Sequence, residues 1–88
     1  MQSRLLHSVT PEYPRLAIIT RTHGIVQIEA VITREGTIDP ARLRVISGHV
    51  LLVEAAVEAV KQWRYRPTLL NGEPVEVLTT ITLNFTLN

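Results

Sequence analysis

The carboxy-terminal run PVEVLTTITLNFTLN, residues 74–88, alternates between two kinds of side chain over its whole length. A period of two is typical of a β-strand with one buried face. The inward set is Val75, Val77, Thr79, Ile81, Leu83, Phe85 and Leu87, and the outward set is Glu76, Leu78, Thr80, Thr82, Asn84 and Thr86. We therefore expect a long final strand, launched by the corner WRYRP and by the hairpin signal Asn71-Gly72.

Two shorter strands are predicted earlier in the chain. Residues 25–36 alternate, with Val26, Ile28, Ala30 and Ile32 on one face. After a turn at Gly36, residues 37–47 return as a second strand, whose middle is irregular because Asp39-Pro40 cannot sit in a regular ladder. In that strand Leu43 and Val45 are expected to point inward, and Arg42 and Arg44 outward.

Two helices complete the predicted elements. Residues 14–24 read as a short helix that starts at Pro14, carries Leu16 and Ile19 on one face and stops at Gly24. Residues 48–63 are the clearest helix, with Ser47 as its expected cap and Trp63 as a large core residue at its end. Its apolar positions recur at helical spacing: Leu52, Ala55, Ala56, Ala59, Val60 and Trp63.

The element order is helix, strand, strand, helix, strand. A right-handed crossover through the second helix places the last strand beside the first. The predicted fold class is therefore α+β, an α-β-β-α-β domain with a three-stranded antiparallel sheet in the order 2-1-3 and both helices packed on one face. The last strand lies at an edge. With 88 residues, the chain is expected to form one domain, residues 1–88, whose core is about 9–87.

Composition and charge narrow the function classes. The net charge of +1 gives no electrostatic reason to expect DNA or an anionic membrane, and there is no cysteine for a disulfide or thiolate site. His7, His23 and His49 lie in separate segments. Ser47 and His49 are two positions apart, but no carboxylate is indicated that would complete a triad. We expect no enzyme activity, no metal and no cofactor, and we expect Glu29 and Glu76 to be solvated.

The last strand suggests a binding function instead. Residues 77–88 contain neither charge nor proline, although natural edge strands are usually protected by such residues. The strand therefore either pairs within the fold or frays, or it receives a guest strand by β-augmentation. A homodimer formed through the same edge is an alternative.

A weaker alternative is single-stranded nucleic-acid binding, in which Tyr65 stacks a base while Arg64 and Arg66 contact phosphates. In the structural interpretation of the same corner, Tyr65 packs beside Trp63, and the two arginines stay solvated or pair with Glu73 and Glu76. The chain has only 5% aromatic residues, which favours the structural interpretation, and nucleic acid is not among the expected partners.

Several motifs occur together in one order. They are PEYPRLA at 11–17, HGIVQIEAVITREGTI at 23–38, VISGHVLLVEAAVEAVKQWRYRP at 45–67, and NGEPVEV at 71–77 before the alternating tail. In this combination the chain resembles the TonB C-terminal domain family over roughly residues 9–87. The resemblance implies the fold given above.

It also implies a function. TonB-like proteins connect the inner-membrane motor ExbB–ExbD to TonB-dependent outer-membrane transporters, and their periplasmic C-terminal domain captures the transporter's TonB box as a strand added to the last strand. The implied location is the periplasm, with an inner-membrane anchor in a part of the protein that this chain lacks. The corner residues Arg64 and Arg66 are weaker candidates for contact with the transporter. Carried onto this sequence, the peptide-binding residues are Leu78, Thr79, Thr80, Ile81, Thr82, Leu83, Asn84 and Phe85.

Overall fold

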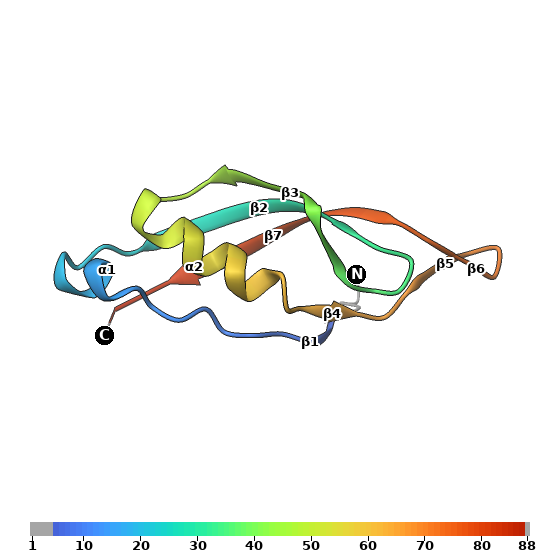
Figure 1. Ribbon diagram of the computed structural model, residues 1–88, viewed down its shortest axis with the longest axis horizontal. Coiled ribbons are helices and arrows are strands. Elements are labelled where there is room, and N and C mark those ends of the chain that lie inside the picture. The colour runs from blue at the N-terminus through green and yellow to red at the C-terminus, as the bar shows by residue number, and fades with distance from the viewer. Residues whose placement is uncertain (1–4, 88) are drawn as a thin grey trace.

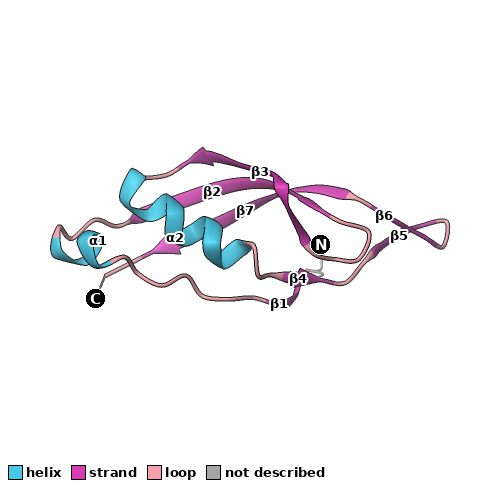
Figure 2. Cartoon of the chain, in the orientation of Figure 1, coloured by secondary structure: helices cyan, strands magenta, loops and turns pink. Residues whose placement is uncertain are grey.

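The computed structural model describes residues 5–87. It contains two helices and seven strands in that range (Figures 1 and 2). In chain order they are β1 (Leu5–His7), α1 (Arg15–Ile19), β2 (Gly24–Ile32), β3 (Ile38–Ser47), α2 (Val50–Val60), β4 (Arg64–Tyr65), β5 (Thr68–Leu70), β6 (Glu73–Val75) and β7 (Val77–Phe85).

The main sheet has the strand order β3-β2-β7, and both of its pairings are antiparallel. The two helices lie on one face of this sheet (Figure 1). The predicted α-β-β-α-β arrangement and the 2-1-3 order are therefore confirmed. The remaining strands form two small ribbons, β1-β4 and β5-β6.

The core lies between the sheet and α2. Alternate residues of β2 and β7 face the helix, and they are the ones the period of two predicts. On the helix side, the alanines allow α2 to approach the sheet closely. The buried residues of these three elements are Val26, Ile28, Ala30, Ile32, Leu52, Ala56, Ala59, Val60, Ile81, Leu83 and Phe85. Leu43 and Val45 of β3 pack against this core, as expected.

The predicted bend in β3 is also present. Ala30 of β2 pairs with Leu43 and Ile32 pairs with Ile38, so a step of two positions in β2 is matched by a step of five in β3, and the register shifts there. The extra residues around Asp39-Pro40 form a bulge, because proline has no N–H to give to a regular ladder.

The first helix differs from its prediction. It spans only five residues, its buried residue is Ala17, and Leu16 and Ile19 are 56% and 69% exposed. The reason is an early stop: Arg21 adopts a left-handed conformation with φ 56°, the Thr22 N–H donates to the Ala17 carbonyl at 2.8 Å, and the Arg21 N–H donates to the Ile18 carbonyl at 3.1 Å. These two bonds form a Schellman C-cap in which arginine occupies the usual glycine position. Gly24 begins β2 and does not end the helix.

The second helix is shorter than the predicted 48–63, and its cap is His49 instead of Ser47. The His49 Nδ1 accepts a hydrogen bond from the Leu51 N–H at 3.0 Å. Trp63 is only half-buried at the edge of the core, and its indole N–H donates to the Val9 carbonyl at 3.0 Å. The indole therefore ties the amino-terminal segment to the end of α2 and is not fully enclosed in the core.

The final strand is divided. Asn71 and Gly72, with φ 53° and 83°, form the tight turn of the β5-β6 hairpin, as their sequence predicts. Glu76 then separates β6 from β7, so the predicted continuous strand over 74–88 is two strands. Residue 88 lies outside the described residues. The β5-β6 hairpin projects from the body at one end of the long axis (Figure 1).

Candidate functional site

The candidate site is the outer margin of β7. On its inner side β7 pairs with β2 over nine consecutive residue pairs, from Gly24 with Phe85 to Ile32 with Val77, without a bulge. On its outer side, no strand within residues 5–87 pairs with it. The amino-terminal strand β1 could have closed this margin, but it pairs with β4.

The direction of the free backbone groups follows from the alternation along β2. Thr33 directly follows the last residue of β2, Ile32. Its N–H donates to the Thr37 carbonyl at 2.8 Å, so the peptide groups of Thr33 point toward the β3 side. Because these directions alternate along a strand, the N–H and C=O groups of the even-numbered residues of β2 point toward β7. Their partners in β7 are odd-numbered residues. The N–H and C=O groups of Leu78, Thr80, Thr82 and Asn84 therefore point away from the sheet.

The same four residues carry their side chains on the face of the sheet that is not part of the core. The four residues with outward peptide groups are exposed, and Leu78 is 64% exposed. No residue of β7 is charged. The eight residues expected to bind peptide, 78–85, thus divide into four whose peptide groups point outward and four whose peptide groups point toward β2.

The opposite margin of the sheet is different. It belongs to β3, which carries the bulge near Pro40 and the exposed arginines Arg42 and Arg44. A bulge and charged side chains are the usual means of protecting an edge strand from a second chain. The sheet therefore has one guarded margin and one unguarded margin.

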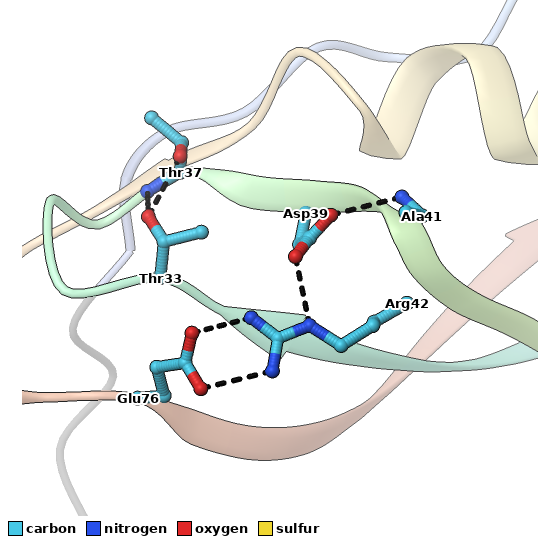
Figure 3. Close-up of polar contacts among 6 residues, drawn as sticks. All are labelled: Thr33, Thr37, Asp39, Ala41, Arg42 and Glu76. Atoms are coloured by element: carbon cyan, nitrogen blue, oxygen red, sulfur yellow. Dashed lines mark hydrogen bonds and ion pairs between the residues drawn. The ribbon is translucent and has the colours of Figure 1, made fainter.

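An ion-pair network fixes the start of the unguarded strand (Figure 3). Arg42 reaches from the β3 bulge across the sheet to the carboxylate of Glu76, to which it donates two hydrogen bonds, one of 2.9 Å. Its Nε donates to Asp39 Oδ2 at 2.8 Å, and Asp39 Oδ1 accepts from the Ala41 N–H at 2.9 Å. The sequence does not predict this pairing, because only the bulge brings Arg42 toward Glu76.

Arg42 also changes the acidity of its partners. Its hydrogen bonds lower the pKa of both Glu76 and Asp39 below their ordinary values, and the Ala41 N–H contributes to the shift at Asp39. A second cross-strand pair joins Arg44 to Glu29 at 2.9 Å. We expected Glu29 and Glu76 to be solvated; Glu29 is half-buried and Glu76 is exposed, and both are paired with arginines of β3.

The corner that follows α2 is held against the β2-β3 turn. The Tyr65 N–H donates to the Gly36 carbonyl at 2.7 Å, and the Tyr65 ring packs against the core, where burial raises the pKa of its hydroxyl. Arg64 and Arg66 are exposed, and Arg64 donates to the Trp63 carbonyl at 3.0 Å. Neither arginine forms the ion pair with Glu73 or Glu76 that the structural interpretation offered as one possibility. The aromatic residues between positions 5 and 87 are all buried or half-buried, so the structure does not support base stacking on Tyr65.

The described part of the chain contains no group of three or more side chains that could hold a metal ion. His23 Nδ1 lies 3.2 Å from the Arg21 carbonyl, and His49 caps α2. None of the described helices has the length and apolar character needed to cross a membrane.

The geometry defines a small α+β domain with one receptive sheet margin, and comparisons with known proteins give its family. The model of the Gram-negative bacterial TonB protein C-terminal domain matches residues 9–87. Protein TonB of Vibrio cholerae serotype O1 is 35% identical over 79 residues, which cover 90% of this chain and 32% of that protein. Protein tonB2 of Pseudomonas aeruginosa is 30% identical over 83 residues, which cover 94% of this chain and 31% of that protein.

The solution NMR structure of the Pseudomonas aeruginosa TonB CTD superimposes with a TM-score of 0.77 at 26% identity, covering 94% of this chain and 84% of that one. The chain therefore belongs to the TonB C-terminal domain family, as its motifs predicted. It spans about a third of the length of the curated relatives it matches.

Proposed function

We propose that this chain is the periplasmic, non-enzymatic peptide-binding domain of a TonB-like energy transducer, with residues 9–87 as the domain core. It captures the TonB box of an outer-membrane transporter as a strand added to β7. The observation that carries the proposal is the unguarded margin of β7, where Leu78, Thr80, Thr82 and Asn84 direct their peptide groups outward. Membership of the TonB family supports the class of partner.

Backbone pairing sets the strength of such capture. The four outward residues offer four donors and four acceptors. If six of these bonds form, at about 0.5–1.5 kcal/mol each, they contribute about 3–9 kcal/mol before the cost of ordering the peptide. Since a Kd of about 1 μM corresponds to about −8 kcal/mol, binding is expected to be weak to micromolar.

Strand addition also suits the transmission of force. A pull along the strand direction loads the bonds of the added strand together, so many modest bonds share the tension. In the full-length protein the pull would come from ExbB–ExbD at the inner membrane, through a part that lies outside this chain. Arg64 and Arg66, both exposed at the corner after α2, are the residues we assign to contact with the transporter surface.

The test is an amide-shift titration of the chain with synthetic N-terminal peptides of candidate transporters. We expect the shifts to concentrate in residues 78–85. Thr82→Pro removes one outward N–H without touching the β2 ladder, and proline is tolerated at such edge positions. It should weaken binding at least fivefold, since it removes a hydrogen bond and disturbs its neighbours.

The matched control is Thr82→Val, which keeps the N–H and suits a strand. It should bind as the parent chain does. If the folded Thr82→Pro and Thr82→Val variants bind equally well, capture through the β7 margin is refuted.

The same open margin supports a second candidate, a homodimer in which two copies pair through β7. Sedimentation at several concentrations distinguishes the two functions. A dimer that excludes the peptide at every dilution would favour dimerisation over capture.

A further inference from the structure

A groove on the helix side of the molecule is not part of the β7 margin. It lies between the amino-terminal segment 9–16 and α2, has a volume of about 600 Å³, and is lined by no residue of β7. Figure 1 shows the amino-terminal segment running alongside α2 to reach α1. Leu16, which the sequence placed on one helix face with Ile19, forms part of its lining and is 56% exposed.

The lining of the groove combines apolar and acidic side chains. Leu16, Val50, Leu51 and Ala55 supply apolar surface, and Val50 is 81% exposed. Glu12, Glu54 and Glu58 are the charged residues of the lining, and no lysine, arginine or histidine is among them.

These three carboxylates have no ion-pair partner within residues 5–87. They are three of the eight acidic residues of a chain whose net charge is +1, so this groove departs from the charge of the whole. A second hollow on the other flank of α2 shares Val50, Glu54 and Glu58 with the groove, but its lining also includes Lys61. Of the two hollows, the one that faces segment 9–16 therefore has the greater excess of negative charge, with Glu12 added and no cation in its lining.

We propose that this groove binds a cationic amphipathic helix of a protein partner. Glu54 and Glu58 are four residues apart on α2, so their side chains are separated by about one turn, roughly 6 Å along the axis. Basic residues spaced by four on a partner helix repeat at the same interval. Leucines spaced between those basic residues then meet Leu16, Leu51 and Ala55.

The walls of the groove favour a helix over an extended peptide. One wall is itself an α-helix, whose internal peptide groups are already paired, and the other contains Pro11 and Pro14, which have no N–H. An extended guest would find few backbone partners here, whereas a helix satisfies its own peptide groups. A symmetric contact with a second copy is disfavoured, because the same patch on both copies would bring the two sets of carboxylates together.

The test uses the full 88-residue chain and a synthetic peptide of about 15 residues, with lysines at i and i+4 and leucines at i+3 and i+7. Its control peptide has the same composition with lysines and leucines scrambled around the helix. We expect saturable binding of the patterned peptide that weakens with added salt, and amide shifts confined to residues 9–16 and 50–62.

Two kinds of variant probe the groove. The double substitution Glu54→Gln and Glu58→Gln should weaken binding about threefold to tenfold, as expected for the loss of two exposed ion pairs. Leu16→Ser should also weaken it severalfold without lowering the Tm, since Leu16 is not in the core. Glu73→Gln, in the distant hairpin strand β6, is the matched control and should change nothing.

Each remaining outcome overturns the proposal. These outcomes are equal binding of the scrambled peptide, affinity unchanged in the Glu54/Glu58 variant, shifts that fall on β7 instead, and no saturable binding at all. Concentration-dependent self-association that blocks the groove would replace the helical partner with a second copy. Because the peptide and the expected shifts differ from those of the TonB-box titration, failure here leaves the proposed function intact.

Discussion

The approach of Gly36 to the corner after α2 can be tested with a pair of glycine substitutions. Gly36 lies in the β2-β3 turn with φ 91°, and a Cβ there would meet the Tyr65 carbonyl oxygen at 2.0 Å and its carbon at 3.0 Å. Gly72, in the β5-β6 turn, has a similar φ of 83° but nothing within 4 Å of the position of a Cβ. Both positions thus carry the same conformational penalty for alanine, and only Gly36 adds a clash.

The magnitudes follow from these two environments. Alanine at positive φ costs about 1–2 kcal/mol, partly offset by the lower entropy of the unfolded chain, so Gly72→Ala should lower the free energy of unfolding by about 1 kcal/mol. Gly36→Ala must in addition push apart two backbones and break the bond from the Tyr65 N–H to the Gly36 carbonyl. We expect a further cost of about 2–4 kcal/mol.

Urea unfolding followed by circular dichroism measures the difference. At about 4–8 °C per kcal/mol for a domain of this size, Gly36→Ala should also lower the Tm by at least about 8 °C more than Gly72→Ala does. If the two variants lose stability equally, to within about 0.5 kcal/mol, the Gly36–Tyr65 approach does not contribute as we infer. A Gly72→Ala variant more damaging than Gly36→Ala would refute the reasoning outright.

Two further predictions concern contacts outside the turns. Because Arg42 lowers the pKa of Asp39 and Glu76, their pairing stabilises the fold above about pH 4, and this contribution is lost as the pH falls through the lowered folded-state pKa values. Arg42→Gln should flatten that acid dependence of the urea midpoint, and an unchanged profile would contradict the network. Trp63→Phe keeps an aromatic ring but loses the bond to the Val9 carbonyl, so it should cost about 1–2 kcal/mol in the same assay, and a loss below about 0.3 kcal/mol would show that the bond is unimportant.

The sequence encodes the sheet strongly because its signal is local. Each inward residue of β2 and β7 is followed two positions later by another, and that period assigns the buried face. The edge position of the last strand follows from the element order and the crossover through α2. The irregular middle of β3 could be predicted for the same reason, since Pro40 excludes a regular ladder at its own position. The candidate site at 78–85 was therefore within reach of sequence reasoning.

Other features depend on residues that are far apart in the chain. The β1-β4 pairing joins Leu5 to Tyr65, and the Trp63 indole reaches Val9. Three-residue strands such as β1 are too short to show a period. The early stop of α1 was missed for a different reason, because Arg21 occupies a left-handed position where the sequence rule looks for glycine.

The open margin of β7 is explained by where the fold uses its amino-terminal segment. That segment is the obvious strand to close the margin from within, yet two attachments hold it elsewhere: β1 pairs with β4, and the Val9 carbonyl accepts from Trp63. Where the segment does meet β7, the Tyr13 ring packs edge-on against the buried side chain of Phe85, with centroids 5.5 Å apart. The amino-terminal segment itself cannot pair with β7 while these contacts persist. Because β7 has neither charge nor proline to repel a second chain, the contacts of the amino-terminal segment are what leaves its outward peptide groups open to the guest strand that we propose.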